Sequence, residues 1–178
     1  MLRGKVLWLG FFLLAAMNAA GWPEGIEFES AGVRSGASAT SRAHNFHQAE
    51  AFGSWNLPWY WNLESQWRLQ SQLQFSAGWL ADPGANAFIG TLGPAVALAR
   101  EGLPLSFEGG VSPTLLSQHH FDTKDFGTNF QFTSHLGIYA ELSAHFRLGY
   151  RFQHMSDAGL ASLNPGLNLH VLSFSYKF

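Results

Sequence analysis

A histidine and a serine near the C-terminal end of the chain have the types and the spacing of an acyl-transfer pair. His154 and Ser156 are two positions apart and continue the alternation of Leu148, Tyr150 and Phe152 with polar residues. Residues at i and i+2 of a β-strand lie on the same face, so the imidazole and the hydroxyl share the apolar face. A hydroxyl with a base in hydrogen-bond reach is the smallest unit for nucleophilic catalysis on an acyl group. The two-residue pattern on its own is weakly specific.

The elements that must position this pair are β-strands. Alternation with period two runs along the chain after residue 21 and is longest over Leu57–Trp79, where odd positions are mostly apolar. Cutting at turn signals predicts eight strands, over residues 24–35, 44–56, 57–79, 86–100, 104–117, 129–142, 145–156 and 167–178. Pro94 and Pro113 fall inside the fourth and fifth strands, where we expect bulges or strand ends. The second strand has no clear apolar face.

An even number of such strands predicts an all-β fold, an eight-stranded antiparallel transmembrane barrel of the outer-membrane type. The connections near 53–58, 101–104 and 142–145 are short, as periplasmic turns are, and those near 36–43, 80–86, 117–128 and 157–166 are longer, as extracellular loops are. The competing class is a soluble lipocalin-like barrel or a sandwich, whose apolar face points inward. Aromatic residues crowd the apolar face and favour the membrane barrel: Trp59, Trp61, Trp67, Trp79, Phe174, Tyr176 and Phe178.

The polar face of these strands carries charges of both signs. We expect them to form ion pairs inside the barrel, because eight strands leave room only for side chains. The charged residues are Glu64, Arg68, Glu108, Glu141 and Arg151.

Several polar residues have the parity of the outward, apolar face. Besides His154 and Ser156, they are Ser134, Asn168 and His170 on the neighbouring strands, near the extracellular end. Polar groups facing lipid cost free energy unless they interact with one another or with headgroups. The cluster therefore suggests a site on the outer wall, although polar residues at a barrel rim also occur without any function.

Composition excludes several other classes of protein. Only 12% of the 178 residues are charged, the formal net charge is -2 and there is no cysteine. A chain without cysteine has no disulfide, no thiolate zinc site and no cysteine nucleophile. The absence of basic runs argues against nucleic acid as a partner.

The N-terminal 21 residues have the pattern of a signal peptide. Arg3 and Lys5 precede an apolar run from Val6 to Ala16, and small residues follow at Ala19–Gly21. The run is shorter than the roughly 20 residues that a transmembrane helix needs. We therefore expect a signal peptide over residues 1–21 and a barrel over residues 22–178.

The residues around the pair also resemble a known family. The segments 154–159 (HMSDAG), 164–166 (NPG), 126–128 (FGT) and 130–132 (FQF) are similar to the lipid A 3-O-deacylase family of PagL type, and the likeness spans the mature chain. The family's fold is an eight-stranded outer-membrane barrel with an active site on its outer wall. The resemblance implies hydrolysis of the ester that holds a hydroxyacyl chain at position 3 of lipid A, without a metal or organic cofactor.

The resemblance also implies roles for individual residues. Ser156 is the nucleophile and His154 the general base and then acid. Asn164 and Gly159 are oxyanion or site-shaping residues, and Phe132 and Ser134 line the acyl groove.

The chain departs from the family at two positions. The family has an acidic residue fourteen positions after the histidine, where this chain has Asn168, and it usually has asparagine after the serine, where this chain has Asp157. Asn168 can orient the imidazole through its side-chain oxygen but cannot neutralise an imidazolium. Asp157 is the alternative acid, provided that the chain turns its carboxylate back toward the histidine.

The partners that follow are lipid A or lipopolysaccharide in the outer leaflet and, through the C-terminal Phe178, the outer-membrane assembly machinery. Whether the barrel forms a homodimer is left open. The pair His119–His120, with Asp122 and Asp125, is expected in a solvated extracellular loop rather than at a metal. Two other functions stay open: a structural or lipid-binding barrel without activity, suggested by Asn168, and an outer-membrane phospholipid acyl hydrolase.

Overall fold

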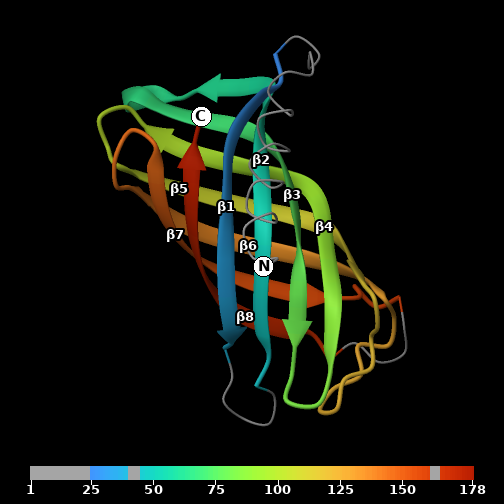
Figure 1. Cartoon of the computed structure of the whole chain (residues 1–178). Helices are drawn as coiled ribbons and strands as arrows, with labels where there is room; N and C mark the ends of the chain where they lie inside the picture. Colours follow the sequence, from blue (N-terminus) through green and yellow to red (C-terminus); the bar gives the residue numbers. More distant parts are fainter. Residues whose placement is uncertain (1–24, 40–44, 161–164) are drawn as a thin grey trace, which may run out of the picture.

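The computed structural model describes residues 25–39, 45–160 and 165–178, and the predicted signal peptide lies outside them. The described strands close into one antiparallel barrel in which each strand pairs with its neighbours in the sequence (Figure 1). They are β1 (Glu27–Ser38), β2 (His47–Asn62), β3 (Trp67–Ala81), β4 (Asn86–Arg100), β5 (Leu105–Leu116), β6 (Phe130–Glu141), β7 (Phe146–Ser156) and β8 (Leu167–Lys177). No helix in the described ranges is long and apolar enough to cross a membrane.

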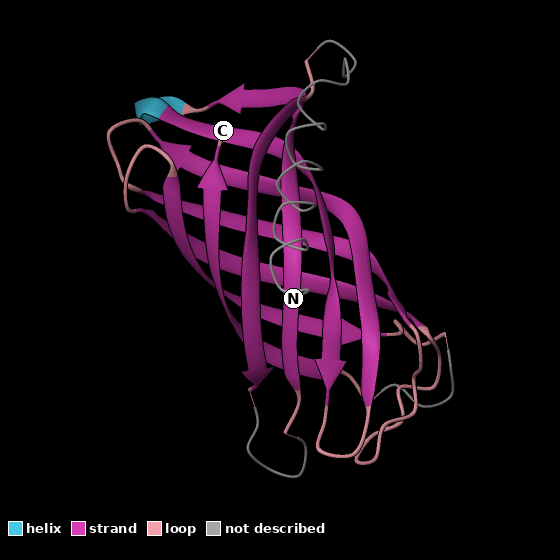
Figure 2. Ribbon diagram, viewed as in Figure 1, coloured by secondary structure: helices cyan, strands magenta, loops and turns pink. Residues whose placement is uncertain are grey.

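The connections differ in length at the two ends of the barrel. Short turns join β2 to β3, β4 to β5 and β6 to β7 at the end where the C-terminus lies (Figure 2). The connections at the other end include the β5–β6 loop, residues 117–129. This end is the extracellular one in a barrel whose termini are periplasmic.

Side chains alternate between the lumen and the outer wall along each strand. In β7, Leu148, Tyr150 and Phe152 are exposed on the outer wall, whereas Arg151 and Gln153 are buried inside. A wall that is apolar outside and polar inside is the reverse of a soluble barrel. The predicted fold class, an outer-membrane-type barrel, is therefore confirmed and the lipocalin-like alternative is excluded.

The predicted boundary between the second and third strands is wrong. No turn occurs at residues 53–58, because β2 continues to Asn62 and turns through residues 63–66, which include a short 3-10 helix. Odd-numbered residues continue to face outward through two irregularities of the chain, so the sequence pattern did not show where the strand ends. One is a register shift between Asn56 and Tyr60, and the other is the turn itself, where Ser65 and Gln66 have positive φ.

The two prolines do not produce the expected bulges or strand ends. β4 continues through Pro94 and β5 through Pro113, and the β4–β5 register is the same on both sides of them. Instead, the pairing between β4 and β5 is interrupted over residues 92–94 and 111–113. Each missing proline N–H therefore falls in this gap, while both prolines stay paired in register with the strand on their other side.

The second strand does have two faces. Gln48, Glu50 and Phe52 are buried toward the lumen, and Ala49 and Ala51 face outward. Small outward residues give little apolar signal, which is why the sequence pattern was unclear.

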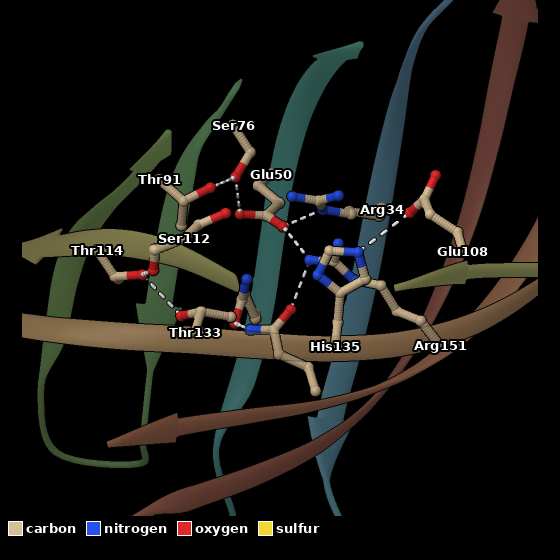
Figure 3. Close-up of polar contacts among 12 residues, drawn as sticks. Arg34, Glu50, Ser76, Thr91, Glu108, Ser112, Thr114, Thr133, His135 and Arg151 are labelled. Atoms are coloured by element: carbon tan, nitrogen blue, oxygen red, sulfur yellow. Dashed lines mark hydrogen bonds and ion pairs between the residues drawn. The ribbon is translucent and has the colours of Figure 1, made fainter. Parts of the chain in front are cut away.

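Buried charges hold the middle of the barrel together (Figure 3). Glu50 forms ion pairs with Arg34 and with Arg151, the latter at 3.4 Å, and accepts a hydrogen bond from Ser76 at 2.9 Å. Glu108 forms a second centre of the network. Its Oε1 lies 3.2 Å from His135 Nε2 and accepts a hydrogen bond from the Tyr139 hydroxyl at 2.8 Å. The lumen is thus filled by a polar network rather than by a channel.

The expectation of lumenal ion pairs is only partly right. Glu108 and Arg151 belong to the network, and Glu141 pairs with Lys177 at 3.4 Å near the periplasmic end. The prediction is wrong for Glu64 and Arg68, because both are exposed at the β2–β3 turn. The sequence pattern had predicted this turn at residues 53–58.

An apolar cluster closes the extracellular mouth. Phe121 and Phe126 of the β5–β6 loop are buried there and pack against Phe46, with ring centroids 5.2 and 5.7 Å away. The loop is thereby fixed across the mouth, next to the ends of β7 and β8.

Candidate functional site

Three neighbouring strands bring the predicted site residues together on the outer wall. In the β6–β7 register, Ser134 pairs with His154 and Phe132 with Ser156. In the β7–β8 register, His154 pairs with Asn168. All five residues lie at the extracellular ends of their strands and are exposed or half-buried, whereas their neighbours in the sequence are mostly buried inside.

His154 and Asn168 are joined by a direct hydrogen bond. The distance from His154 Nδ1 to Asn168 Oδ1 is 2.6 Å. Because an amide oxygen is only an acceptor, this bond places the ring proton on Nδ1 and leaves Nε2 as the basic nitrogen. The backbone of Asn168 is fixed, since its backbone carbonyl oxygen accepts a hydrogen bond from the Ala39 backbone amide at 2.8 Å. The asparagine thus occupies the orienting position that an acid holds in a catalytic triad.

Ser156 is the last residue of β7 and lies on the same face as His154. Two residues along a strand separate their backbones by about 6.6 Å, a distance that the two side chains can bridge. Phe132 stands beside Ser156, with its ring 5.1 Å from that of Phe130. Ser134 makes a long contact of 3.5 Å with the His154 carbonyl. The serine therefore lies on the same face as the imidazole, with an aromatic ring beside it.

Asp157 does not face His154. It is fully buried on the lumenal side, and its Oδ1 accepts a hydrogen bond from the Gly159 amide at 2.8 Å. Ala158 and Gly159 both have positive φ, so this bond closes a tight turn directly after the serine. The structure therefore brings Asn168, and not Asp157, to the imidazole. Gly159 shapes the turn, and its backbone amide donates its hydrogen bond to Asp157. Asn164 lies outside the described residues.

Gly166 is a site residue to which sequence reasoning gave no role. A Cβ at this position would lie 2.8 Å from His154 Cε1 and 3.5 Å from Nε2, so the ring packs directly against the glycine. Gly166 also has a positive φ of 33°, which disfavours larger residues. Its place between Pro165 and the start of β8 was the available signal.

A second polar pair lies on the same wall, nearer the periplasmic end than His154. The phenol oxygen of Tyr150 and Nδ1 of His170 are 2.7 Å apart, and the Phe152 ring stands against the histidine. Two outward polar groups thus satisfy one another within an apolar surface. The predicted outward cluster therefore consists of two parts, and His170 belongs to the one farther from Ser156.

Comparison with known proteins assigns the family. The family model described as "Lipid A 3-O-deacylase (PagL)" matches residues 49–177, a range that includes all described site residues. The chain belongs to the PagL family.

Individual members show how far this likeness extends. The "Lipid A deacylase PagL" of Bordetella bronchiseptica (strain ATCC BAA-588 / NCTC 13252 / RB50) is 38% identical over 71 residues, which are 40% of each chain. The match thus spans about two fifths of that PagL.

Solved structures agree on the fold. The crystal structure described as the outer membrane enzyme PagL has a TM-score of 0.71 at 19% identity and covers 82% of this chain and 97% of its own. Neisserial surface protein A (NspA) follows with a TM-score of 0.50 at 11% identity, covering 87% of this chain and 100% of its own. This PagL-family chain is an outer-membrane β-barrel.

The paired histidines of this PagL-family barrel lie in the β5–β6 loop, as expected. Both contact one carboxylate: His119 Nδ1 lies 2.8 Å from Asp125 Oδ1, and His120 Nδ1 lies 3.3 Å from Oδ2. The Gly127 amide and these two rings lower the pKa of Asp125 to about 2. No group of three or more metal-ligating side chains is present in the part of the chain that the structure describes. The contacts of Asp125 with His119, His120 and Gly127 hold this part of the loop together.

Proposed function

We propose that this chain hydrolyses the ester at position 3 of lipid A and releases the hydroxyacyl chain. The observation that carries the proposal is the 2.6 Å hydrogen bond between His154 and Asn168, beside Ser156, on the outer wall of a PagL-family barrel. A site on the outer wall meets its substrate within the leaflet, so the acyl chain need not leave the lipid. The extracellular level of the site matches the leaflet that contains lipid A.

The first half of the reaction forms an acyl-enzyme. His154 Nε2 removes the proton from the Ser156 hydroxyl as its oxygen attacks the ester carbonyl. The imidazolium then gives that proton to the sugar oxygen as the ester bond breaks. Asn168 keeps the ring in the required tautomer throughout, but its neutral amide supplies no charge to the imidazolium.

The second half regenerates the enzyme. A water molecule, deprotonated by the same nitrogen, attacks the acyl-serine, and the proton returns to Ser156 as the hydroxy acid leaves. Phe132 lies beside the serine and Ser134 beside the histidine, and both are suited to guide the acyl chain along the wall. The aromatic ring gives the chain an apolar surface, and the hydroxyl gives the site a polar group near the ester.

The experiment that tests the substrate uses the purified barrel in detergent with lipid A or with phospholipid. Mass spectrometry of the lipids should show lipid A lighter by one hydroxyacyl group and unchanged phospholipid. Loss of acyl chains from phospholipid instead would identify a phospholipid hydrolase. If neither lipid changed, the barrel would be a binding or structural protein.

A further inference from the structure

A single lysine of the β5–β6 loop lies next to the catalytic histidine. The loop is anchored across the barrel mouth by Phe121 and Phe126, and Lys124 lies between these two residues in the sequence. Its ammonium group donates a hydrogen bond to the carbonyl oxygen of Gly166. Gly166 in turn packs against the His154 ring, as described above. One residue therefore separates the Lys124 ammonium from the imidazole.

The position of Lys124 is fixed, but its hydrogen-bonding capacity is not used up. The ammonium lies 5.6 Å from the centroid of the Phe126 ring, and the side chain is half-buried. An ammonium has three N–H donors, and the structure shows one of them bonded, to Gly166. Within residues 25–39, 45–160 and 165–178 this ammonium makes no second hydrogen bond, which leaves two donors for a group that approaches from the outside.

Three carboxylates at this end of the barrel have other partners. Asp82 accepts hydrogen bonds from the Thr123 amide and hydroxyl, Asp125 contacts the two histidines, and Asp157 accepts from Gly159. Within the described ranges, no carboxylate forms an ion pair with Lys124. Burial lowers the pKa of Lys124, as expected when a charge is partly withdrawn from water without a counter-charge.

The geometry points to an anionic group of the substrate as the missing counter-charge. Lipid A is a phosphorylated and acylated glucosamine disaccharide, so its phosphates lie at the level of the sugar, just above the acyl chains. Lys124 lies in a loop beyond the extracellular ends of the strands. Ser156 and His154 lie on β7, nearer the membrane interior, and face the acyl chains. We propose that Lys124 binds a phosphate group of the lipid A headgroup and so selects phosphorylated lipid A. This inference rests on the function proposed above.

The test compares phosphorylated with dephosphorylated lipid A. Lys124→Gln should raise KM for phosphorylated lipid A about 10- to 100-fold, the usual range for one hydrogen bond to a charged group, and change kcat little. The same variant should show nearly the same KM for phosphorylated and for dephosphorylated lipid A, and Lys124→Arg should retain most of the selectivity. Lys177→Gln, at the other end of the barrel, is the matched control and should behave as the wild type on both lipids.

Two results would overturn the inference. An equal loss on both lipids would show that Lys124 acts only by holding Gly166 against His154. No loss on either lipid would show that it has no role in the reaction.

A binding measurement separates this inference from the proposed function. The Ser156→Ala barrel, which should bind without hydrolysis, is expected to prefer phosphorylated lipid A, and adding Lys124→Gln should remove the preference. Equal affinity for both lipids before Lys124 is changed would refute the inference even if the wild type is a deacylase. Inorganic phosphate at the same concentration should not compete. If it did, the site would be for a free anion and not for the headgroup.

Discussion

His154 Nδ1 and Asn168 Oδ1 lie 2.6 Å apart across the β7–β8 pair, on the face of the barrel that meets the membrane. The amide holds the imidazole in one tautomer but leaves the imidazolium without a negative partner. The site therefore has the orientation of a triad without its third charge, and this combination makes Asn168 the most informative position to change.

Substitution of Asn168 should move the rate in both directions. Asn168→Glu supplies the missing charge and should raise hydrolysis of the position-3 ester. Asn168→Leu removes the acceptor and should lower the rate by about 10²-fold, the lower range for general-base catalysis. Steady-state rates on lipid A check both variants, with Asn86→Leu, an exposed asparagine at the start of β4, as the control. If neither Asn168 variant changed the rate, the hydrogen bond between His154 and Asn168 would have no part in the reaction.

Gly166 should tolerate no side chain. Gly166→Ala places a methyl group 2.8 Å from His154 Cε1, so the ring must shift. Misplacement of a catalytic group by about 1 Å can cost about 10²-fold, and we expect a loss of that order in kcat. Gly102→Ala is the matched control, because Gly102 also has a positive φ, +77°, but nothing within 4 Å of its added Cβ. Equal activity of the two variants would mean that the contact with His154 is unimportant.

The network around Glu50 should dominate the stability of the barrel. Glu50→Gln leaves Arg34 and Arg151 buried without their counter-charge, which typically costs about 3–5 kcal/mol. Urea unfolding of the folded barrel in detergent measures the change in the free energy of unfolding. The control is Glu64→Gln at the exposed turn, which should change the free energy by less than about 0.5 kcal/mol. Similar effects of the two substitutions would show that the lumenal pairs contribute little.

Acidification should break the Asp125 contacts of the β5–β6 loop at an unusually low pH. The Gly127 amide and the rings of His119 and His120 lower the pKa of Asp125 from 3.8 to about 2. Because the pKa of the folded state is depressed, this contribution to loop stability is complete above about pH 4 and is lost as the pH falls through 2. The chemical shift of the Gly127 amide should titrate with a midpoint near 2, and Asp125→Asn should abolish the transition. A midpoint near 4 would contradict the contacts.

Much of the site could be predicted because barrel geometry is simple. Period-two alternation placed His154, Ser156 and Asn168 on one face, and pairing of consecutive strands then made His154 and Asn168 neighbours. Strand boundaries were less predictable where the outward parity persisted through an irregularity. The predicted boundary between β2 and β3 is wrong for this reason. Odd-numbered residues keep facing outward past the register shift and past the turn at residues 63–66.

The contacts made by loops were not predictable from local patterns. Lys124 reaches Gly166 over 42 residues of sequence, and this contact depends on how Phe121 and Phe126 fill the barrel mouth. Loop sequences carry no period from which such packing follows. The joint contact of His119 and His120 with Asp125 was missed for the same reason.

The central claim is that Ser156 attacks the position-3 ester of lipid A. It is tested most directly by comparing the hydroxy fatty acid released by the wild type, by Ser156→Ala and by Ser35→Ala, which changes an exposed serine on the outer wall, in β1. All three barrels should fold, as shown by heat-dependent migration on gels. We predict release by the wild type and by Ser35→Ala, and none above background by Ser156→Ala. Release by a folded Ser156→Ala barrel at the wild-type rate would contradict the account.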